Sequence, residues 1–188
     1  MSRAFIRALL LQATVVLAGA LWPAHVHAQQ APFADEDRDW GVAATRQLRT
    51  TDYHAPTPRT IPGGKAVTTL ELKALLEKEP RPYLIDVLGG GVHRTLAGAF
   101  WMLASGAGDL SRDEEKRFIE AIGKFAGGDK SRGMVFYCVD SQCWLSYNAA
   151  LRAIAAGYTN VMWYRGGIAA WRTAGFPMSQ SDPFFWKD

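Results

Sequence analysis

The stretch that most constrains the fold is 133–144, GMVFYCVDSQCW. Its segment 134–137 is apolar and rich in aromatic and β-branched residues, which is typical of a short buried strand. The strand is expected to stop at Cys138, and a helical pattern begins at Cys143 or the next residue and ends at Gly157. This predicts a thiol at the carboxyl end of a strand, beneath a helix N-terminus. Open α/β sheets bind ligands there, and backbone N–H groups there favour a thiolate.

Strands and helices alternate along the rest of the chain. Capping boxes at Thr68 and Ser111 predict the starts of two helices, and a double glycine at 166–167 opens a last short helix. The expected strands are 83–87, 98–102, 134–137 and 160–164. This alternation predicts an α/β fold with a doubly wound parallel sheet and helices on both faces.

The first residues have the pattern of a secretory signal. Arg3 and Arg7 form a basic region, 8–21 is an apolar run, and Ala28 ends a cleavage motif of small residues. We expect 1–28 to be a signal peptide, with release of the mature protein into the periplasm and no membrane span after signal removal. The alternative is an anchor that stays attached to the membrane.

The charge balance excludes one class of partner. The chain of 188 residues has a formal net charge of +3, and two of these charges lie in the signal segment. The remainder is close to neutral and has no long basic run, so we expect no nucleic-acid partner. After cleavage, His54 and His93 are the remaining histidines, and with two cysteines they make no convincing metal site, so none is expected.

The segment between the signal and the domain has its own composition. Residues 29–64 are rich in Pro, Asp and Arg and show little periodicity. We expect an extended N-terminal arm packed over the domain, with its first dozen or so residues loose. The domain itself is expected at 65–188, including a short C-terminal tail.

The two cysteines lie in one loop, which limits the reasons for their presence. A disulfide across so short a loop stabilises a fold by only about 2 kcal/mol in the chain-entropy model. One alternative is a pair of small, buried, inert side chains. We favour local chemistry, with an accessible, reversible disulfide between Cys138 and Cys143 that exchanges with other thiols.

The motifs taken together resemble a single rhodanese domain over Lys65–Pro177. The residues that carry this resemblance are Asp86 at a strand end, Gly98-Ala99, Tyr137-Cys138, Gly157-Tyr158-Thr159-Asn160-Val161 and Gly166-Gly167-Ile168-Ala169-Ala170-Trp171. The chain also resembles the exported group named for a CXXCW motif and associated with catabolism that depends on pyrroloquinoline quinone. The residues for that group are Thr51-Asp52-Tyr53, Ala55-Pro56-Thr57-Pro58, Gly127-Gly128-Asp129-Lys130, Tyr137-Cys138, Cys143-Trp144 and Asn148-Ala149-Ala150. The literal CXXCW motif is not met, because the upstream thiol is Cys138.

The resemblance implies a role for Cys138. In rhodaneses this cysteine takes a sulfur atom from a donor such as thiosulfate, becomes a persulfide and passes the sulfur on. A covalent persulfide on Cys138 would be the only prosthetic group, and no other cofactor is expected. The resemblance also implies a binding loop, formed here by Val139, Asp140, Ser141, Gln142 and Trp144.

The loop departs from the rhodanese pattern in charge. Val139 and Cys143 stand where the resemblance would place arginines, and Asp140 opposes both a thiolate and an anionic donor. We therefore expect weak thiosulfate activity. Arg94, after the glycine-rich segment 89–91, is a candidate for the missing cation, and His93 is a candidate base.

Three functions remain open from the sequence. The chain could be a sulfurtransferase that uses Cys138, or a thiol–disulfide or persulfide relay with Cys143 as the resolving thiol. It could also be an inactive rhodanese-fold binding module with Trp144, Trp163 and Tyr164 as contact residues. The expected partner is a small sulfur donor or a periplasmic redox protein, and the oligomeric state is left open.

Overall fold

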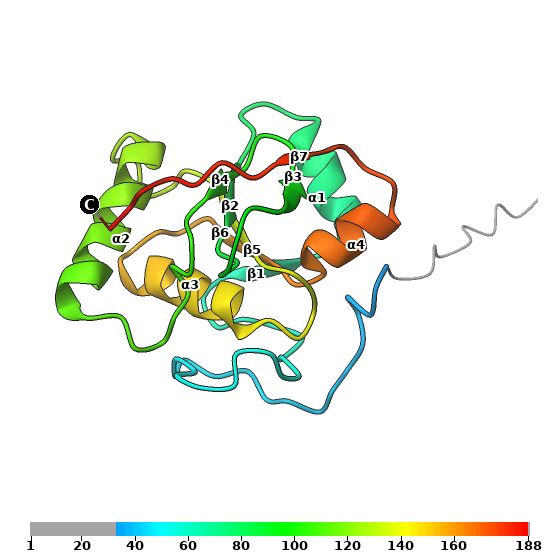
Figure 1. Cartoon of the computed structure of the whole chain (residues 1–188), viewed down its shortest axis with the longest axis horizontal. Coiled ribbons are helices and arrows are strands. Elements are labelled where there is room, and N and C mark those ends of the chain that lie inside the picture. Colours follow the sequence, from blue (N-terminus) through cyan, green and yellow to red (C-terminus); the bar gives the residue numbers. More distant parts are fainter. Residues whose placement is uncertain (1–32, 188) are drawn as a thin grey trace, which may run out of the picture. The chain divides into compact units, whose positions relative to one another are not determined.

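The computed structural model of the chain describes residues 33–187 (Figure 1). The predicted signal peptide lies outside the described residues. Within them, five parallel strands form one sheet in the order β1-β6-β5-β2-β4. These strands are β1 (Lys65–Val67), β2 (Tyr83–Asp86), β4 (Phe100–Trp101), β5 (Met134–Tyr137) and β6 (Val161–Tyr164).

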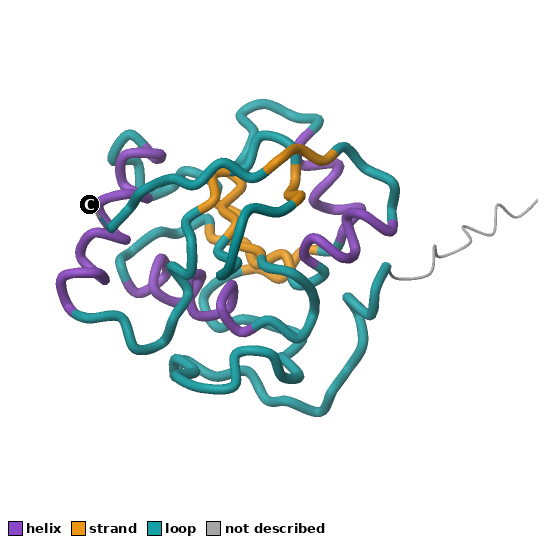
Figure 2. Tube along the Cα trace, viewed as in Figure 1, coloured by secondary structure: helices purple, strands orange, loops and turns teal. Residues whose placement is uncertain are grey.

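The predicted cysteine strand is the central strand of this sheet. Phe136 of β5 lies between Ile85 of β2 and Trp163 of β6 in the register. Because the strands are parallel, their carboxyl ends meet at one edge of the sheet. Cys138, directly after β5, therefore lies in the middle of that edge. Figure 2 shows the strands of the sheet in orange, with helices in purple around them.

Helices cover each face of the sheet, as predicted. They are α1 (Thr69–Leu76), α2 (Arg112–Ala126), α3 (Trp144–Ala155) and α4 (Gly167–Thr173). In Figure 1, α2 and α3 lie to the left of and below the sheet, and α1 and α4 lie to its right.

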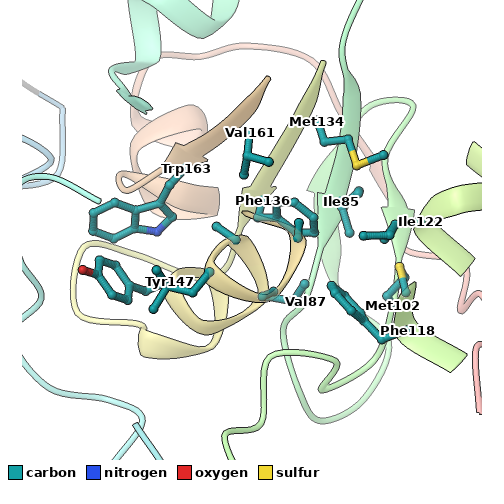
Figure 3. Close-up of a cluster of buried hydrophobic side chains, with 14 of the residues drawn as sticks. Ile85, Val87, Met102, Phe118, Ile122, Met134, Phe136, Tyr147, Val161 and Trp163 are labelled. Carbon is teal, nitrogen blue, oxygen red and sulfur yellow. The ribbon is translucent and has the colours of Figure 1, made fainter. Parts of the chain in front are cut away.

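Alternation along each strand divides the apolar side chains between two cores. Phe136 and Trp163 face α2 and α3, where Phe118 and Tyr147 join them (Figure 3). The residues on the other face pack against Leu72 of α1 and Ala170 and Trp171 of α4; they are Leu84, Val135, Tyr137, Met162 and Tyr164. A strand buried on both faces loses the simple apolar–polar alternation, which explains the continuous apolar runs in the sequence.

The predicted helix starts are confirmed in atomic detail. Thr68 accepts a hydrogen bond from the Glu71 amide, and the Glu71 carboxylate accepts one from the Thr68 amide. Ser111 and Glu114 form the same reciprocal pair at the start of α2. Each capping box satisfies backbone donors that would otherwise lack an intrahelical partner.

The C-terminal tail adds structure that the periodicity did not predict. Its segment β7 (Met178–Gln180) pairs antiparallel with β3 (Arg94–Leu96) in a separate two-stranded sheet. Farther on, Trp186 is buried and donates its indole N–H to the Leu103 carbonyl. The tail therefore crosses from the β3 side to α2 (Figure 1).

Residues 33–64 of the N-terminal arm form no helix and pack on the domain, with buried contacts already at Glu36. Glu36 is buried, and its carboxylate accepts hydrogen bonds of 2.8 Å and 2.6 Å from the Thr69 amide and hydroxyl. Burial raises the pKa of Glu36, partly offset by these hydrogen bonds. Glu36 is therefore a buried member of the charge run at 35–39.

Among residues 33–187, no helix has the length and apolar character needed to cross a bilayer.

Candidate active site

The Cys138 and Cys143 side chains are joined by a disulfide across the loop that follows β5. Their Cα atoms are 6.1 Å apart, within the range that a disulfide can bridge. Cys138 is 1% exposed and Cys143 is 4% exposed. The expectation of an accessible disulfide is therefore wrong, because neighbouring segments cover both cysteines.

Asp140 shapes the turn between the two cysteines. Its Oδ1 accepts a 2.9 Å hydrogen bond from the Gln142 amide, and its carbonyl accepts one from the Cys143 amide. Cys143 is then the N-cap residue of α3, with extended backbone angles. The Asp140 carboxylate also lies 3.3 Å from Nε2 of His54. It therefore contacts both the loop backbone and the N-terminal arm.

The start of α4 holds the other side of the loop. The amides of Ile168 and Ala169 donate to the carbonyls of Cys138 and Val139, at 3.0 Å and 2.8 Å. Gly167 has φ +57°, and a Cβ at this position would lie 2.4 Å from the Cys138 carbonyl oxygen. Only glycine lets the backbone of α4 approach the loop this closely.

The N-terminal arm covers the loop and the start of α3. The Ala55 amide donates to the Gln142 carbonyl, and the Trp144 amide donates to the Tyr53 carbonyl, each at 2.8 Å. The Thr57 hydroxyl donates to the Ser141 carbonyl at 2.5 Å. These contacts make the arm part of the site, which the sequence analysis did not assign to it.

A buried arginine that the sequence analysis missed lies beside the loop. Arg165 follows β6 directly, is 3% exposed and donates from Nε to the Thr57 hydroxyl at 3.0 Å. Its Nη1 and Nη2 donate to the carbonyls of Glu36 and Thr57. Burial lowers the pKa of Arg165, yet a guanidinium stays charged in proteins. Its signal in the sequence is an arginine between an apolar strand and a double glycine.

Asp86 ends β2, as predicted, and is the centre of a buried polar network. Its Oδ2 accepts hydrogen bonds from His93 Nε2 at 2.8 Å and from the Thr95 hydroxyl at 2.6 Å. Since Thr95 donates to Asp86, the Tyr137 hydroxyl donates to Thr95, at 2.7 Å. Hydrogen bonding to Asp86 raises the pKa of His93. The network thus connects β2, β3 and β5. Its member in β5, Tyr137, directly precedes Cys138.

The structure does not give His93 and Arg94 the roles suggested for them. The His93 ring nitrogens face Asp86 and the Gly91 carbonyl. Arg94 donates to the Met178 carbonyl at 3.0 Å and so secures the pairing of β3 with β7. Within the described part of the chain, neither side chain has a hydrogen bond or ion pair with the cysteine loop.

The aromatic residues suggested as a contact surface are core residues. Trp144, Trp163 and Tyr164 are all buried. The indole N–H of Trp144 donates to the Pro56 carbonyl, and that of Trp163 donates to the Ser146 hydroxyl at 3.0 Å. These three side chains cannot form an exposed binding face in this structure.

No cluster of three or more His, Cys, Asp or Glu side chains suited to a metal ion occurs in residues 33–187.

The fold and the loop together define a class of protein: a single α/β domain with a cysteine at the carboxyl end of its central parallel strand. The Rhodanese-like domain family model matches residues 68–174, and the chain belongs to this family. Sulfurtransfer or a related activity is what this family assignment suggests. No curated protein matches the sequence significantly.

The chain is similar to several solved structures at low identity. A thiosulfate sulfurtransferase from Pseudomonas aeruginosa is 15% identical over 64% of this chain, with a TM-score of 0.46. The chain spans 21% of that protein's length. The rhodanese-like domain of an Anabaena protein is 23% identical over 63% of this chain and 80% of its own, with a TM-score of 0.42. A yeast protein tyrosine phosphatase of the rhodanese family is 20% identical over 60% and 87%, with a TM-score of 0.46.

Proposed function

We propose that this protein carries sulfane sulfur on Cys138 and that Cys143 resolves the resulting persulfide. The observation that supports the proposal best is the position of the two cysteines. Cys138 ends the central strand, and its bonded partner is the N-cap residue of α3. The disulfide then corresponds to the oxidised end of a reaction cycle, and the dithiol is the form that accepts sulfur.

The proposed reaction cycle consists of persulfide formation, resolution of the persulfide and reduction of the disulfide. The Cys138 thiolate attacks the sulfane sulfur of a donor such as thiosulfate, forming a persulfide and releasing sulfite. The Cys143 thiol then loses its proton to the departing group and attacks the inner sulfur, Cys138 Sγ. This step forms the Cys138–Cys143 disulfide and releases hydrosulfide. A dithiol protein supplies the two electrons and two protons that restore the reduced pair.

The proposal also includes the cellular location of the protein and its partners. Cleavage after Ala28 would deliver the protein to the periplasm, where a disulfide can persist. There a small sulfur donor and a redox protein would be its partners. On the resemblance to the group associated with catabolism that depends on pyrroloquinoline quinone, we also propose that the reaction accompanies alcohol oxidation.

Mass spectrometry of defined thiol states tests the proposal. The reduced wild-type chain and the Cys143→Ser variant are each mixed with thiosulfate, and free thiols are then blocked. The variant is expected to retain one added sulfur on Cys138, because its resolving thiol is gone. The wild-type protein is expected to release about one hydrosulfide for each disulfide formed.

The other outcomes separate the alternatives. Added sulfur that persists on Cys138 in the wild-type protein would support a plain sulfurtransferase, in which Cys143 has no resolving role. Disulfide formation with no sulfur ever bound would support a thiol–disulfide relay. An absence of sulfur uptake and of thiol exchange would leave the binding module, which the burial of both cysteines favours.

A further inference from the structure

The proposed reaction places negative charge on Cys138, yet the loop around it contains no cation. Its charged residue is Asp140, which has the same sign as a thiolate or a persulfide. Arg94, the cation suggested from the sequence, instead binds Met178 in the two-stranded sheet. A reaction through a thiolate therefore needs a positive charge from a different element.

The register of the central strands gives Arg165 and Cys138 equivalent positions, each one residue beyond a registered pair. Tyr137 of β5 pairs with Tyr164 of β6, and both tyrosines face the core beside α1 and α4. Successive side chains along a strand point to opposite faces. Cys138 and Arg165, the next residues in each chain segment, therefore leave the sheet on the other face, where Cys138 joins the core beside α3.

Thr57 of the N-terminal arm connects Arg165 to the cysteine loop. Arg165 Nε donates to the Thr57 hydroxyl at 3.0 Å, and that hydroxyl donates to the Ser141 carbonyl at 2.5 Å. Only one side chain thus separates the guanidinium from the backbone of the cysteine loop. Thr57 is fully buried, so the interaction is shielded from solvent.

Within the described residues, the Arg165 guanidinium forms no direct ion pair with a carboxylate. In the part of the chain that the structure describes, its guanidinium donates to uncharged oxygens of Thr57 and Glu36. The Glu36 carboxylate points instead to Thr69. Other charged side chains also act on Arg165: Arg59 lowers its pKa, and Asp37, Asp39 and Asp35 raise it. A buried guanidinium held by neutral oxygens extends a positive potential to its surroundings.

We propose that Arg165 supplies the positive charge that stabilises the thiolate and persulfide of Cys138, in place of arginines within the loop. It acts at a distance through its charge, and so is a positioning residue. This inference rests on the proposed use of Cys138 as the sulfur carrier. It assigns to the arginine before the double glycine a role in the electrostatics of the site.

A titration of the Cys138 thiol tests this role. The chain carries Cys143→Ser, so that Cys138 is the remaining thiol, and serine is itself a good N-cap residue. The ultraviolet absorbance of the thiolate is followed against pH, which requires no reagent to reach the buried sulfur. We expect a midpoint below the ordinary cysteine value of about 8.5. A midpoint at or above that value overturns the proposal even if no Arg165 variant folds.

Substitutions then assign the effect to the charge. Arg165→Gln, which keeps hydrogen-bonding groups, is expected to raise the midpoint by about 1 unit or more. Arg165→Lys is expected to restore most of the shift. Thr57→Val is the matched control, because it breaks the connection to Ser141 but leaves the charge, and its midpoint should stay near that of the parent chain.

Three results contradict the proposal: an unchanged midpoint in Arg165→Gln, equal shifts in the Gln and Lys variants, or a shift in Thr57→Val as large as in Arg165→Gln. The last two would assign the effect to a displaced arm. The titration uses a chain that cannot form the disulfide and receives no sulfur donor. Its result therefore stands apart from the sulfur-uptake experiment, which can fail or succeed independently.

Discussion

His54 of the N-terminal arm forms an antiparallel β-bridge with Cys143, the cysteine at the start of α3. The arm thereby continues the hydrogen bonding of the cysteine loop, with Tyr53 and Ala55 bonded to Trp144 and Gln142 on either side. Segments almost ninety positions apart in the chain thus form one unit. The arm both fixes the loop and restricts access to its sulfur atoms.

Loosening the arm should expose the disulfide. Ala55→Pro removes the N–H that donates to Gln142, and one lost hydrogen bond costs about 0.5–1.5 kcal/mol. We expect reduction by a small phosphine to become about 2- to 10-fold faster, as followed by the appearance of free thiols. The control is Ala44→Pro, at an exposed arm position whose amide donates to none of the described residues. Equal rates in the two variants would mean that reduction does not require the arm to separate from the loop.

The close approach of α4 to the loop predicts a glycine requirement at one position. Gly167→Ala combines a positive φ with a Cβ contact of 2.4 Å to the Cys138 carbonyl, and we expect it to lower the free energy of unfolding by about 2–4 kcal/mol. Gly175→Ala is a matched control, since Gly175 has φ +72° and no atom within 4 Å of the added Cβ. It should cost about 1–2 kcal/mol. Urea unfolding measures both values, and a similar loss in both would refute the steric argument.

The Asp86–His93 pair predicts a dependence of stability on pH. Hydrogen bonding to Asp86 raises the pKa of His93 in the folded state above its ordinary value of 6.5. The protonated ring therefore stabilises the fold fully below about pH 6.5, and this contribution is lost as the pH rises through the raised folded pKa. Urea unfolding across this range should show the loss in the wild-type protein and a flatter profile in His93→Gln. A His93→Gln profile as steep as the wild-type one would exclude His93 as the source.

The charge of Asp140 should weaken the uptake of an anionic sulfur donor. Asp140→Asn removes this charge but keeps the Oδ1 atom that accepts the Gln142 amide, so the turn is preserved. We expect the thiosulfate concentration for half-maximal persulfide on Cys138 to fall about 3- to 10-fold, measured in the Cys143→Ser chain. Asp113→Asn, in the exposed first turn of α2, is the control. The same value in both variants would show that Asp140 does not limit donor binding.

Local patterns predicted most of the secondary structure. The capping boxes at Thr68 and Ser111 contain their own hydrogen-bonding partners within three residues, so the chain segment alone determines the helix start. Buried parallel strands such as β5 are visible as continuous apolar runs. The pairing of β3 with β7 has no such signal, because Arg94–Leu96 and Met178–Gln180 become strands only by hydrogen bonding to each other.

The sequence by itself determined that a cysteine would end a buried strand and precede a helix, because periodicity, turn residues and caps act over short distances. Only the tertiary structure decided what surrounds that cysteine. The register of β5 and β6 gives Arg165 and Cys138 equivalent positions at the edge of the sheet, and the arm places Thr57 against Ser141. Arg94 is separated from the loop by its own strand pairing. The electrostatic potential at the cysteines and the access of solvent to their sulfur atoms depend on side chains from distant segments. Local sequence patterns do not predict such contacts.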